Sequence, residues 1–122
     1  MHKCRLGGLL LLAGMLASAD IGRAQSWEHL EGEDLYSAFR SHELQYDNGA
    51  VQRFDGSGRT EYRKPNAWNI DGLWWVDANL LCFVLTPGNT DCYKVRRHSD
   101  GLELKLEAEH GGTVRLRYRD EK

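Results

Sequence analysis

The sequence predicts a small, mainly β protein: an antiparallel meander or small barrel of 7–8 strands, with an N-terminal helix and one disulfide. Three observations support this fold class. Apolar and polar residues alternate with a period of two over much of the chain after residue 41. Asn, Asp, Gly and Pro recur between the alternating segments, where strands would turn. Two cysteines flank one of these turns, and the 122 residues suffice for a single domain.

The N-terminus has the composition of a secretory signal peptide. Lys3 and Arg5 form a short basic region, and an apolar segment follows over residues 6–17. Small residues then offer two cleavage sites, which end at Ala19 and Ala24. The apolar segment is shorter than the ~20 residues that cross a bilayer, so we expect no membrane span. The sequence therefore predicts a periplasmic or secreted protein with a signal peptide over residues 1–24.

Processing would leave one β-rich domain over residues 25–122. Removal of three basic and one acidic residue reduces the 16 Lys and Arg and the 18 Asp and Glu to 13 and 17, a net charge of about −4. Nucleic-acid-binding proteins carry a basic excess, so we expect no nucleic-acid partner. A chain of this size buries only a modest core, and exported domains of this kind commonly gain stability from a disulfide.

Residues 26–41 have helical periodicity. The apolar positions that share one helix face are Trp27, Leu30, Leu35, Ala38 and Phe39. Gly32 interrupts this pattern, so a turn followed by a short helix over about 33–41 is an equally good prediction. On one long helix, His29 and Glu33 could share a metal. A solvated polar face is the favoured interpretation because no third ligand accompanies them.

Short strands and turns follow the helix. The expected strands cover about 44–46, 50–54, 60–62, 70–76, 80–86 and 91–97. Asn48-Gly49 between two alternating segments is typical of a type I′ hairpin turn. The Asp55-Gly56-Ser57-Gly58 segment predicts the next turn, and Lys64-Pro65-Asn66 ends the strand after it.

The last hairpin has the clearest alternation of the chain. A two-residue loop at Gly111-Gly112 would place Leu106 opposite Arg117 and mix apolar and charged side chains on one face. A three-residue loop, His110-Gly111-Gly112, keeps the apolar side chains together, so we expect that loop. The pairs that it predicts are Leu106–Leu116, Leu104–Tyr118, Glu107–Arg115 and Glu103–Arg119.

Cys82 and Cys92 are the only cysteines that remain if Cys4 leaves with the signal peptide. They lie symmetrically about Pro87, so a hairpin centred there brings them together, and an exported chain would oxidise them to a disulfide. A zinc site would need two further ligands at suitable spacing, and a nucleophilic cysteine would need a free thiol with a histidine partner. The disulfide is therefore the prediction.

The same pairing assigns the two faces of this hairpin. The core side is expected to hold Leu81, Phe83, Leu85, Tyr93 and Val95. Leu80 and Val84 lie on the other side with Cys82 and would need cover. The apolar face of the N-terminal helix is the expected cover.

Several short motifs can be compared with known families. They are Tyr46 to Gly49, Phe54-Asp55-Gly56, Gly72-Leu73-Trp74, Leu81-Cys82 and Cys92-Tyr93-Lys94-Val95. Together they resemble a family of small secreted bacterial proteins with no assigned function, which carry a short helix, a Gly-x-Trp strand and a Leu-Cys…Cys-Tyr hairpin. The resemblance covers about residues 30–107. It implies a similar fold and export, and it assigns no active site.

Four aromatic residues are candidates for lining a ligand site at a barrel mouth: Tyr62, Trp68, Trp74 and Trp75. Aromatic residues of a small β domain are more often core, and the sequence leaves open which of the paired tryptophans is buried. No metalloprotease, nucleophile-elbow or dinucleotide-binding signature is present, so we expect no enzyme, no cofactor and no metal site.

Five basic residues are candidates for an exposed binding surface: Lys94, Arg96, Arg115, Arg117 and Arg119. Such a surface could hold an acidic polymer or partner, but charge pairing with Glu103 and Glu107 is the favoured interpretation. The expected function is a non-catalytic exported binding module for a small apolar ligand or a cell-envelope component. The alternative is a protein–protein accessory, such as an inhibitor of an extracellular enzyme.

Overall fold

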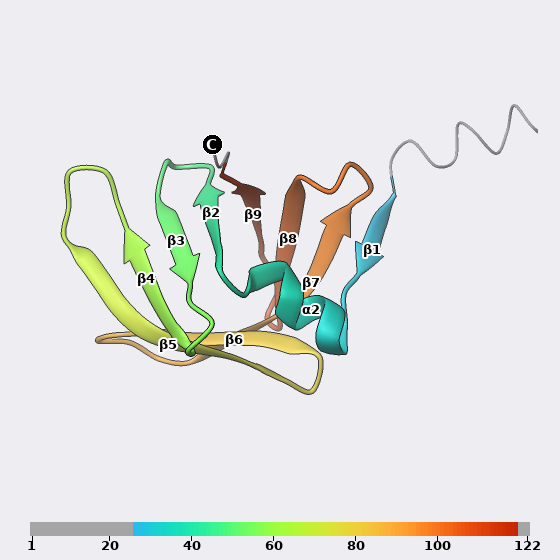
Figure 1. Cartoon of the computed structure of the whole chain (residues 1–122), viewed down its shortest axis with the longest axis horizontal. Coiled ribbons are helices and arrows are strands. Elements are labelled where there is room, and N and C mark those ends of the chain that lie inside the picture. Colours follow the sequence, from blue (N-terminus) through green and yellow to red (C-terminus); the bar gives the residue numbers. More distant parts are fainter. Residues whose placement is uncertain (1–25, 120–122) are drawn as a thin grey trace, which may run out of the picture.

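The computed structural model describes residues 26–119, which form nine strands and one helix (Figure 1). Their bounds are β1 Trp27–His29, α2 Gly32–Phe39, β2 His42–Tyr46, β3 Val51–Phe54, β4 Arg59–Arg63, β5 Asn69–Asp77, β6 Leu80–Leu85, β7 Asp91–His98, β8 Glu103–Ala108 and β9 Thr113–Tyr118. The expected signal peptide, its cleavage sites and Cys4 lie outside the described residues. No helix within the described range is long and apolar enough to cross a membrane.

The strands from β2 to β9 form a closed antiparallel barrel. Each pairs with its neighbour in sequence, and β9 returns to pair with β2, with Leu44 opposite Tyr118. Closure satisfies the backbone groups that an open sheet would leave at its edges. The predicted fold class is thereby confirmed as an eight-stranded barrel with one helix and one disulfide.

The N-terminal segment divides at Gly32 rather than forming one long helix. Trp27, Glu28 and His29 pair with the end of β7, beyond the part of β7 that pairs with β6. Gly32 then has a positive φ of 54°, and α2 begins there. The long-helix alternative is wrong, and the short-helix alternative is confirmed. His29 consequently lies in a strand and shares no helix face with Glu33.

The buried face of α2 packs into the barrel core. Leu35, Ala38 and Phe39 belong to the same cluster as Leu81 and Phe83 of β6. The Phe39 and Phe54 rings meet edge to face, with centroids 5.0 Å apart. The prediction that the helix covers the outer side of β6 is wrong, because its apolar residues face the core side. Leu80 and Val84 remain half-buried on the outer side.

The β6–β7 hairpin confirms the expected cysteine pairing. Cys82 lies opposite Cys92, and their sulfur atoms are bonded at 2.08 Å. The expected core face is also confirmed. Leu81, Phe83 and Val95 are buried, and Leu85 and Tyr93 pack against the same cluster.

The β8–β9 hairpin has the expected three-residue loop length but a different position. Ala108 donates its amide to the carbonyl of Gly112 at 3.1 Å, so the loop residues are 109–111. Leu104 therefore lies opposite Leu116, and Glu103 opposite Arg117. Each predicted partner is displaced by two residues, which leaves every side chain on its predicted face. The four predicted pairs are wrong, but the assignment of faces is right.

The β2–β3 hairpin also differs from its predicted turn type. A type I′ turn needs positive φ at both central residues, but in this loop only Gly49 has a positive φ, of 92°. Tyr46 donates its amide to the carbonyl of Ala50 at 2.8 Å, so Asp47, Asn48 and Gly49 form a three-residue loop. The Asn48 side chain accepts the amide of Ala50 at 2.9 Å, which stabilises this geometry.

Gly72 of the Gly-x-Trp strand occupies a point of close backbone approach. A Cβ atom at this position would lie 2.0 Å from the carbonyl oxygen of Val84 on β6. Such contacts are typical of glycines where strongly bent strands cross. The motif thus contains glycine for packing reasons, and Trp74 two residues later points into the core.

Three consecutive hydrogen bonds link polar groups of β2, β3 and β4 beside the core. The Tyr46 hydroxyl donates to Gln52 Oε1 at 2.5 Å, and Gln52 Nε2 donates to the Thr60 hydroxyl at 2.9 Å. The Thr60 hydroxyl donates to the carbonyl of Arg53 at 2.7 Å. Burial, and secondarily the neighbouring Tyr62 and Tyr93, raise the pKa of Tyr46 well above its usual value of 10.0.

Alkaline pH is therefore expected to destabilise the fold. The unfolded chain loses the Tyr46 proton near pH 10 while the folded chain keeps it, so the free energy of unfolding should fall as pH rises above about 10. Each such proton contributes a slope of about 1.4 kcal/mol per pH unit. Urea unfolding between about pH 8 and 11.5 measures this slope, and Tyr46→Phe is expected to reduce it. An equal slope in the variant would contradict the assignment to Tyr46.

Candidate ligand-binding cleft

The middle of the barrel is occupied by core side chains contributed by both α2 and the strands. Buried residues that contribute to it include Leu30, Leu35, Phe39, Leu44, Phe54, Trp74, Phe83, Leu104, Leu106 and Leu116. A packed interior of this kind is what small eight-stranded barrels allow, because they are just wide enough for their own side chains. A ligand site is therefore to be sought at the barrel ends or on its outer surface.

The structure does not bring the four predicted aromatic residues together. Trp74 points into the core and is 3% exposed, and its indole N–H donates to the carbonyl of Asp55 at 2.8 Å. Trp75 points outward, opposite Cys82, and is 37% exposed. Trp68 lies in the β4–β5 loop and is 90% exposed, whereas the half-buried Tyr62 meets Tyr46 edge to face at 5.4 Å.

Three of the five predicted basic residues form ion pairs with glutamates. Arg117 donates to Glu103 at 2.6 Å from the neighbouring strand. Arg96 donates to Glu107 at 3.2 Å, and Arg119 contacts Glu43 at 3.5 Å. These contacts agree with the favoured interpretation of cross-strand charge pairing. The partner of Glu103 differs from the predicted one because of the register of the β8–β9 hairpin, whereas Glu107 finds its partner Arg96 on β7, the other neighbour of β8.

The other two basic residues have different surroundings. Arg115 lies over the ring of Trp27 with its guanidinium carbon 5.4 Å from the centroid, and Lys105 contacts the same ring at 4.3 Å. Such cation–π contacts attach β1 to the barrel wall. Lys94 is exposed and forms no ion pair within residues 26–119. Most of this predicted surface thus stabilises the sheet.

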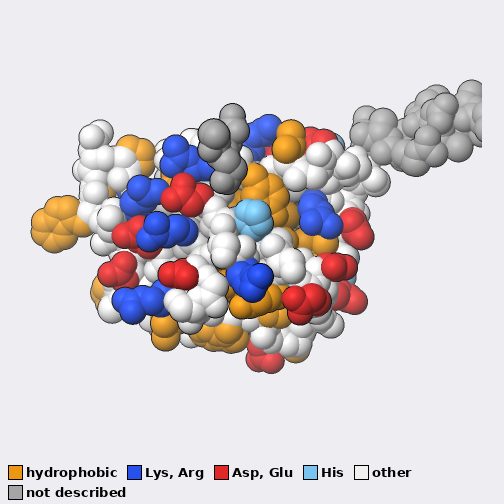
Figure 2. Space-filling view, viewed as in Figure 1, with side chains coloured by type: hydrophobic (Ala, Val, Ile, Leu, Met, Phe, Trp, Pro, Cys, Tyr) orange, Lys and Arg blue, Asp and Glu red, His pale blue; other side chains and the backbone are white. Residues whose placement is uncertain are grey.

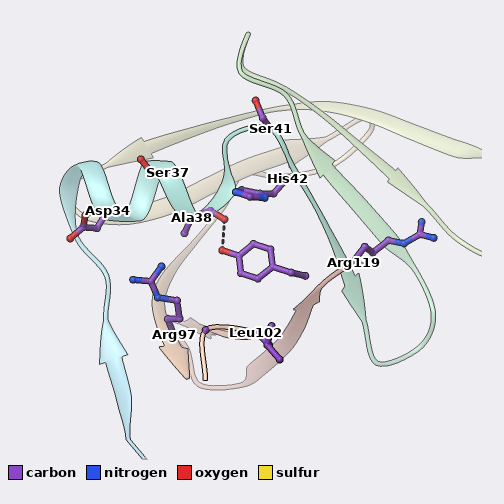
Figure 3. A pocket seen from close by; sticks show the side chains of 10 residues that line it. Asp34, Ser37, Ala38, Ser41, His42, Arg97, Leu102 and Arg119 are labelled. Atoms are coloured by element: carbon purple, nitrogen blue, oxygen red, sulfur yellow. Dashed lines mark hydrogen bonds between the residues drawn. The ribbon is translucent and has the colours of Figure 1, made fainter. Parts of the chain in front are cut away.

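A cleft of about 560 Å³ opens at the barrel end that α2 covers (Figure 3). It lies between the helix, the beginning of β2, the end of β7, the β7–β8 turn and the end of β9. Its lining includes Asp34, Ser37, His42, Arg97, Leu102 and Tyr118. The cleft therefore combines segments that are about 60 to 80 residues apart in sequence.

Tyr118 is the central aromatic group of this cleft. Its hydroxyl donates to the carbonyl of Ala38 on α2 at 2.6 Å (Figure 3), which holds the end of β9 against the helix. The His42 ring meets the Tyr118 ring edge to face at 5.0 Å. Burial raises the pKa of Tyr118, and the nearby Arg97 charge lowers it by less. Tyr118 is thus a neutral hydrogen-bond donor at ordinary pH.

Two arginines line the cleft. Arg119 forms an ion pair with Glu43 at 3.5 Å, so the candidate ligand-binding cation is Arg97. It lies opposite the buried Leu104, so its side chain starts from the inner face of β7. In Figure 3 its guanidinium lies on the same side of the cleft as Asp34, whereas Arg119 extends in the opposite direction. The ion pair of Arg97 with Glu28 is long, at 3.8 Å, and Glu28 is mostly exposed. This leaves the guanidinium available to a ligand.

Sequence reasoning missed this role of Arg97, although a signal was present. Arg97 is not among the five basic residues that the sequence predicts as a binding surface. Side chains alternate along a strand, so the buried Val95 already places Arg97 on the inner face.

The remaining polar pairs show structural roles. His98 Nδ1 accepts the backbone amide of Asp100 at 3.1 Å, and the Asp100 carboxylate accepts the amide of Leu102 at 2.8 Å. The Leu102 hydrogen bond is the main reason that the pKa of Asp100 is lowered. These two residues thus stabilise the β7–β8 turn. In the described range, no group of three His, Cys, Asp or Glu side chains is placed to hold a metal ion.

Comparisons with family models, with curated proteins and with solved structures find no match to this chain. The candidate site therefore rests on its geometry.

Proposed function

We propose that the protein is an exported, non-catalytic binding module that holds a small ligand in the cleft beside α2. The observation that carries this proposal is Arg97, which starts from the inner face of β7 and borders a cleft of about 560 Å³. Pockets of about 300–1,000 Å³ are typical of small-molecule sites. The Cys82–Cys92 disulfide is consistent with export, because such bonds persist in oxidising compartments.

The residues of the cleft suggest the chemistry of the ligand. Leu102 is 53% exposed and Tyr118 adds an aromatic surface, so an apolar group has a place to pack. An arginine guanidinium forms paired hydrogen bonds with a carboxylate or phosphate. Ser37 and His42 add further hydrogen-bonding groups. We therefore favour a small amphipathic ligand with an acidic group over the purely apolar ligand that the sequence suggested.

Octanoate is a suitable probe of this proposal, with octanol as its uncharged counterpart. Titration of the ¹⁵N-labelled protein should produce saturable shifts at the amides of Arg97, Leu102 and Tyr118, and octanol should bind more weakly. Loss of a charged hydrogen bond costs about 1.5–3 kcal/mol, so Arg97→Ala should weaken octanoate binding about 10- to 100-fold.

Arg53→Ala is the matched control. Arg53 is an exposed arginine paired with Glu61 at 3.5 Å and lies outside the cleft. Its replacement should leave octanoate affinity unchanged, and the melting temperatures of both variants should be recorded. Saturable shifts that are absent, or that Arg53→Ala reduces as much as Arg97→Ala, would contradict a site at Arg97.

A further inference from the structure

The outer side of the β5–β6 hairpin carries an apolar surface, here called the outer patch. It consists of Leu73, Trp75, Leu80 and Val84, which surround the Cys82–Cys92 disulfide; Cys82 itself is buried. Leu73 is 56% exposed and Trp75 is 37% exposed. Figure 1 shows β5 and β6 running together along one side of the molecule, and Figure 2 shows hydrophobic side chains gathered along that side.

Charges of both signs border the outer patch. Arg59 of β4 lies opposite Leu73, at one end of the patch, and Asp77 lies opposite Leu80, at the other end. Both side chains belong to exposed residues. Neither forms an ion pair with another residue between positions 26 and 119. Lys94, which forms no ion pair in the same range, lies beside Leu80 and Cys92. The patch therefore combines an apolar centre with two available cations and an available anion.

We propose that the outer patch is the interface of a twofold-symmetric homodimer. Leu73 and Asp77 are each two residues from Trp75, which is about 6.6 Å along the strand in opposite directions. Consider two copies packed face to face about a twofold axis that runs across the strands at Trp75. Leu73 and its neighbours on the adjacent strands then face Asp77 and its neighbours in the other copy. Such an interface is self-complementary, because each contact occurs twice.

This arrangement brings opposite charges together. Arg59 is one strand away from Leu73, a lateral distance of about 4.8 Å that an arginine side chain can span. It can thus reach Asp77 of the second copy, while Val84 meets Leu80 of that copy. A membrane with anionic headgroups would repel Asp77. A partner protein whose charges are all positive or all negative would likewise repel either Arg59 or Asp77. A second copy satisfies both.

The test is sedimentation velocity of the processed protein between about 1 µM and 1 mM, a range that covers weak and moderate dimers. The sedimentation coefficient should increase with concentration towards that of a dimer. Trp75→Glu should weaken the dimer at least about 10-fold, because it places a charge at the centre of the interface. Arg59→Asp and Asp77→Arg should each weaken it, and the double variant should restore it to within about threefold of the original affinity.

Trp68→Glu is the matched control, because Trp68 is also an exposed tryptophan but lies in the β4–β5 loop. It should leave the dimer unchanged. A protein that stays monomeric at every concentration, or that forms a larger assembly, would overturn the proposal. A double charge variant that remains as weak as the single variants would do the same. The charge variants lie on the surface, so they decide the question even if Trp75→Glu fails to fold.

Discussion

Replacement of Trp74 by alanine is expected to lower the free energy of unfolding by about 3–5 kcal/mol, the range for a large aromatic residue in a core. The indole stacks on Tyr36 at 5.3 Å and meets Phe54 edge to face at 5.5 Å. It thereby joins α2 to two strands of the barrel. Its removal would leave a cavity at this junction and would deprive the Asp55 carbonyl of its indole donor.

Trp75→Ala provides the control at the adjacent position. Trp75 lies on the outer face, so its replacement is expected to cost less than about 1 kcal/mol in the monomer. Urea unfolding followed by far-ultraviolet circular dichroism measures both variants without relying on tryptophan fluorescence. The measurement should be made at low protein concentration, where association contributes little. Equal losses for the two variants would mean that the burial of Trp74 is not what stabilises this junction.

The fold class could be predicted because it depends on a pattern that tolerates small errors. In the last hairpin, the predicted register is displaced by two residues, yet Leu104, Leu106 and Leu116 still face the core. A displacement by one residue would have reversed every face. Alternation therefore identified the buried residues, while the individual partners depended on the conformation of Gly111 and Gly112.

In the N-terminal segment, the periodicity of the apolar residues predicted the wrong secondary structure. Trp27 and Leu30 are spaced like helix positions, but backbone hydrogen bonds to β7 are available there. Leu30 donates its amide to the carbonyl of Val95 at 2.9 Å. The last residues of β7 extend past β6 and leave an edge to which β1 can pair. This edge arises from the arrangement of the strands in the barrel, so residues 26–30 contain no local feature that predicts the pairing. Tertiary pairing has overridden local periodicity.

The candidate cleft could not be predicted for the same reason. It forms only when α2 covers one end of the barrel and when β9 returns to β2, which brings Tyr118 to Ala38. The sequence separation of these two residues is 80, and the motifs contain no indication of their contact. Only Arg97 could be placed from the sequence, because it lies two residues after the buried Val95 and so shares its face of the strand.

The disulfide is expected to provide a large share of the stability of this small domain. Cys82 and Cys92 are ten residues apart, and closing a loop of that length contributes about 3 kcal/mol by restricting the unfolded chain. The bond also joins β6 to β7 where Leu81 pairs with Tyr93, so it holds the register of two strands that line the core. Domains of this size have a total stability of only about 5–15 kcal/mol.

Replacement of both cysteines by alanine should therefore lower the free energy of unfolding by about 2–4 kcal/mol, or prevent folding at growth temperature. A reductant should destabilise the original protein by a similar amount and should leave the double variant unchanged, which separates the bond from other effects of the reductant. The mass of the denatured, non-reduced protein after alkylation tests the bond directly. Alkylation of both Cys82 and Cys92 would show that the bond does not form. The stability of the β6–β7 pairing would then have to come from its side-chain contacts alone.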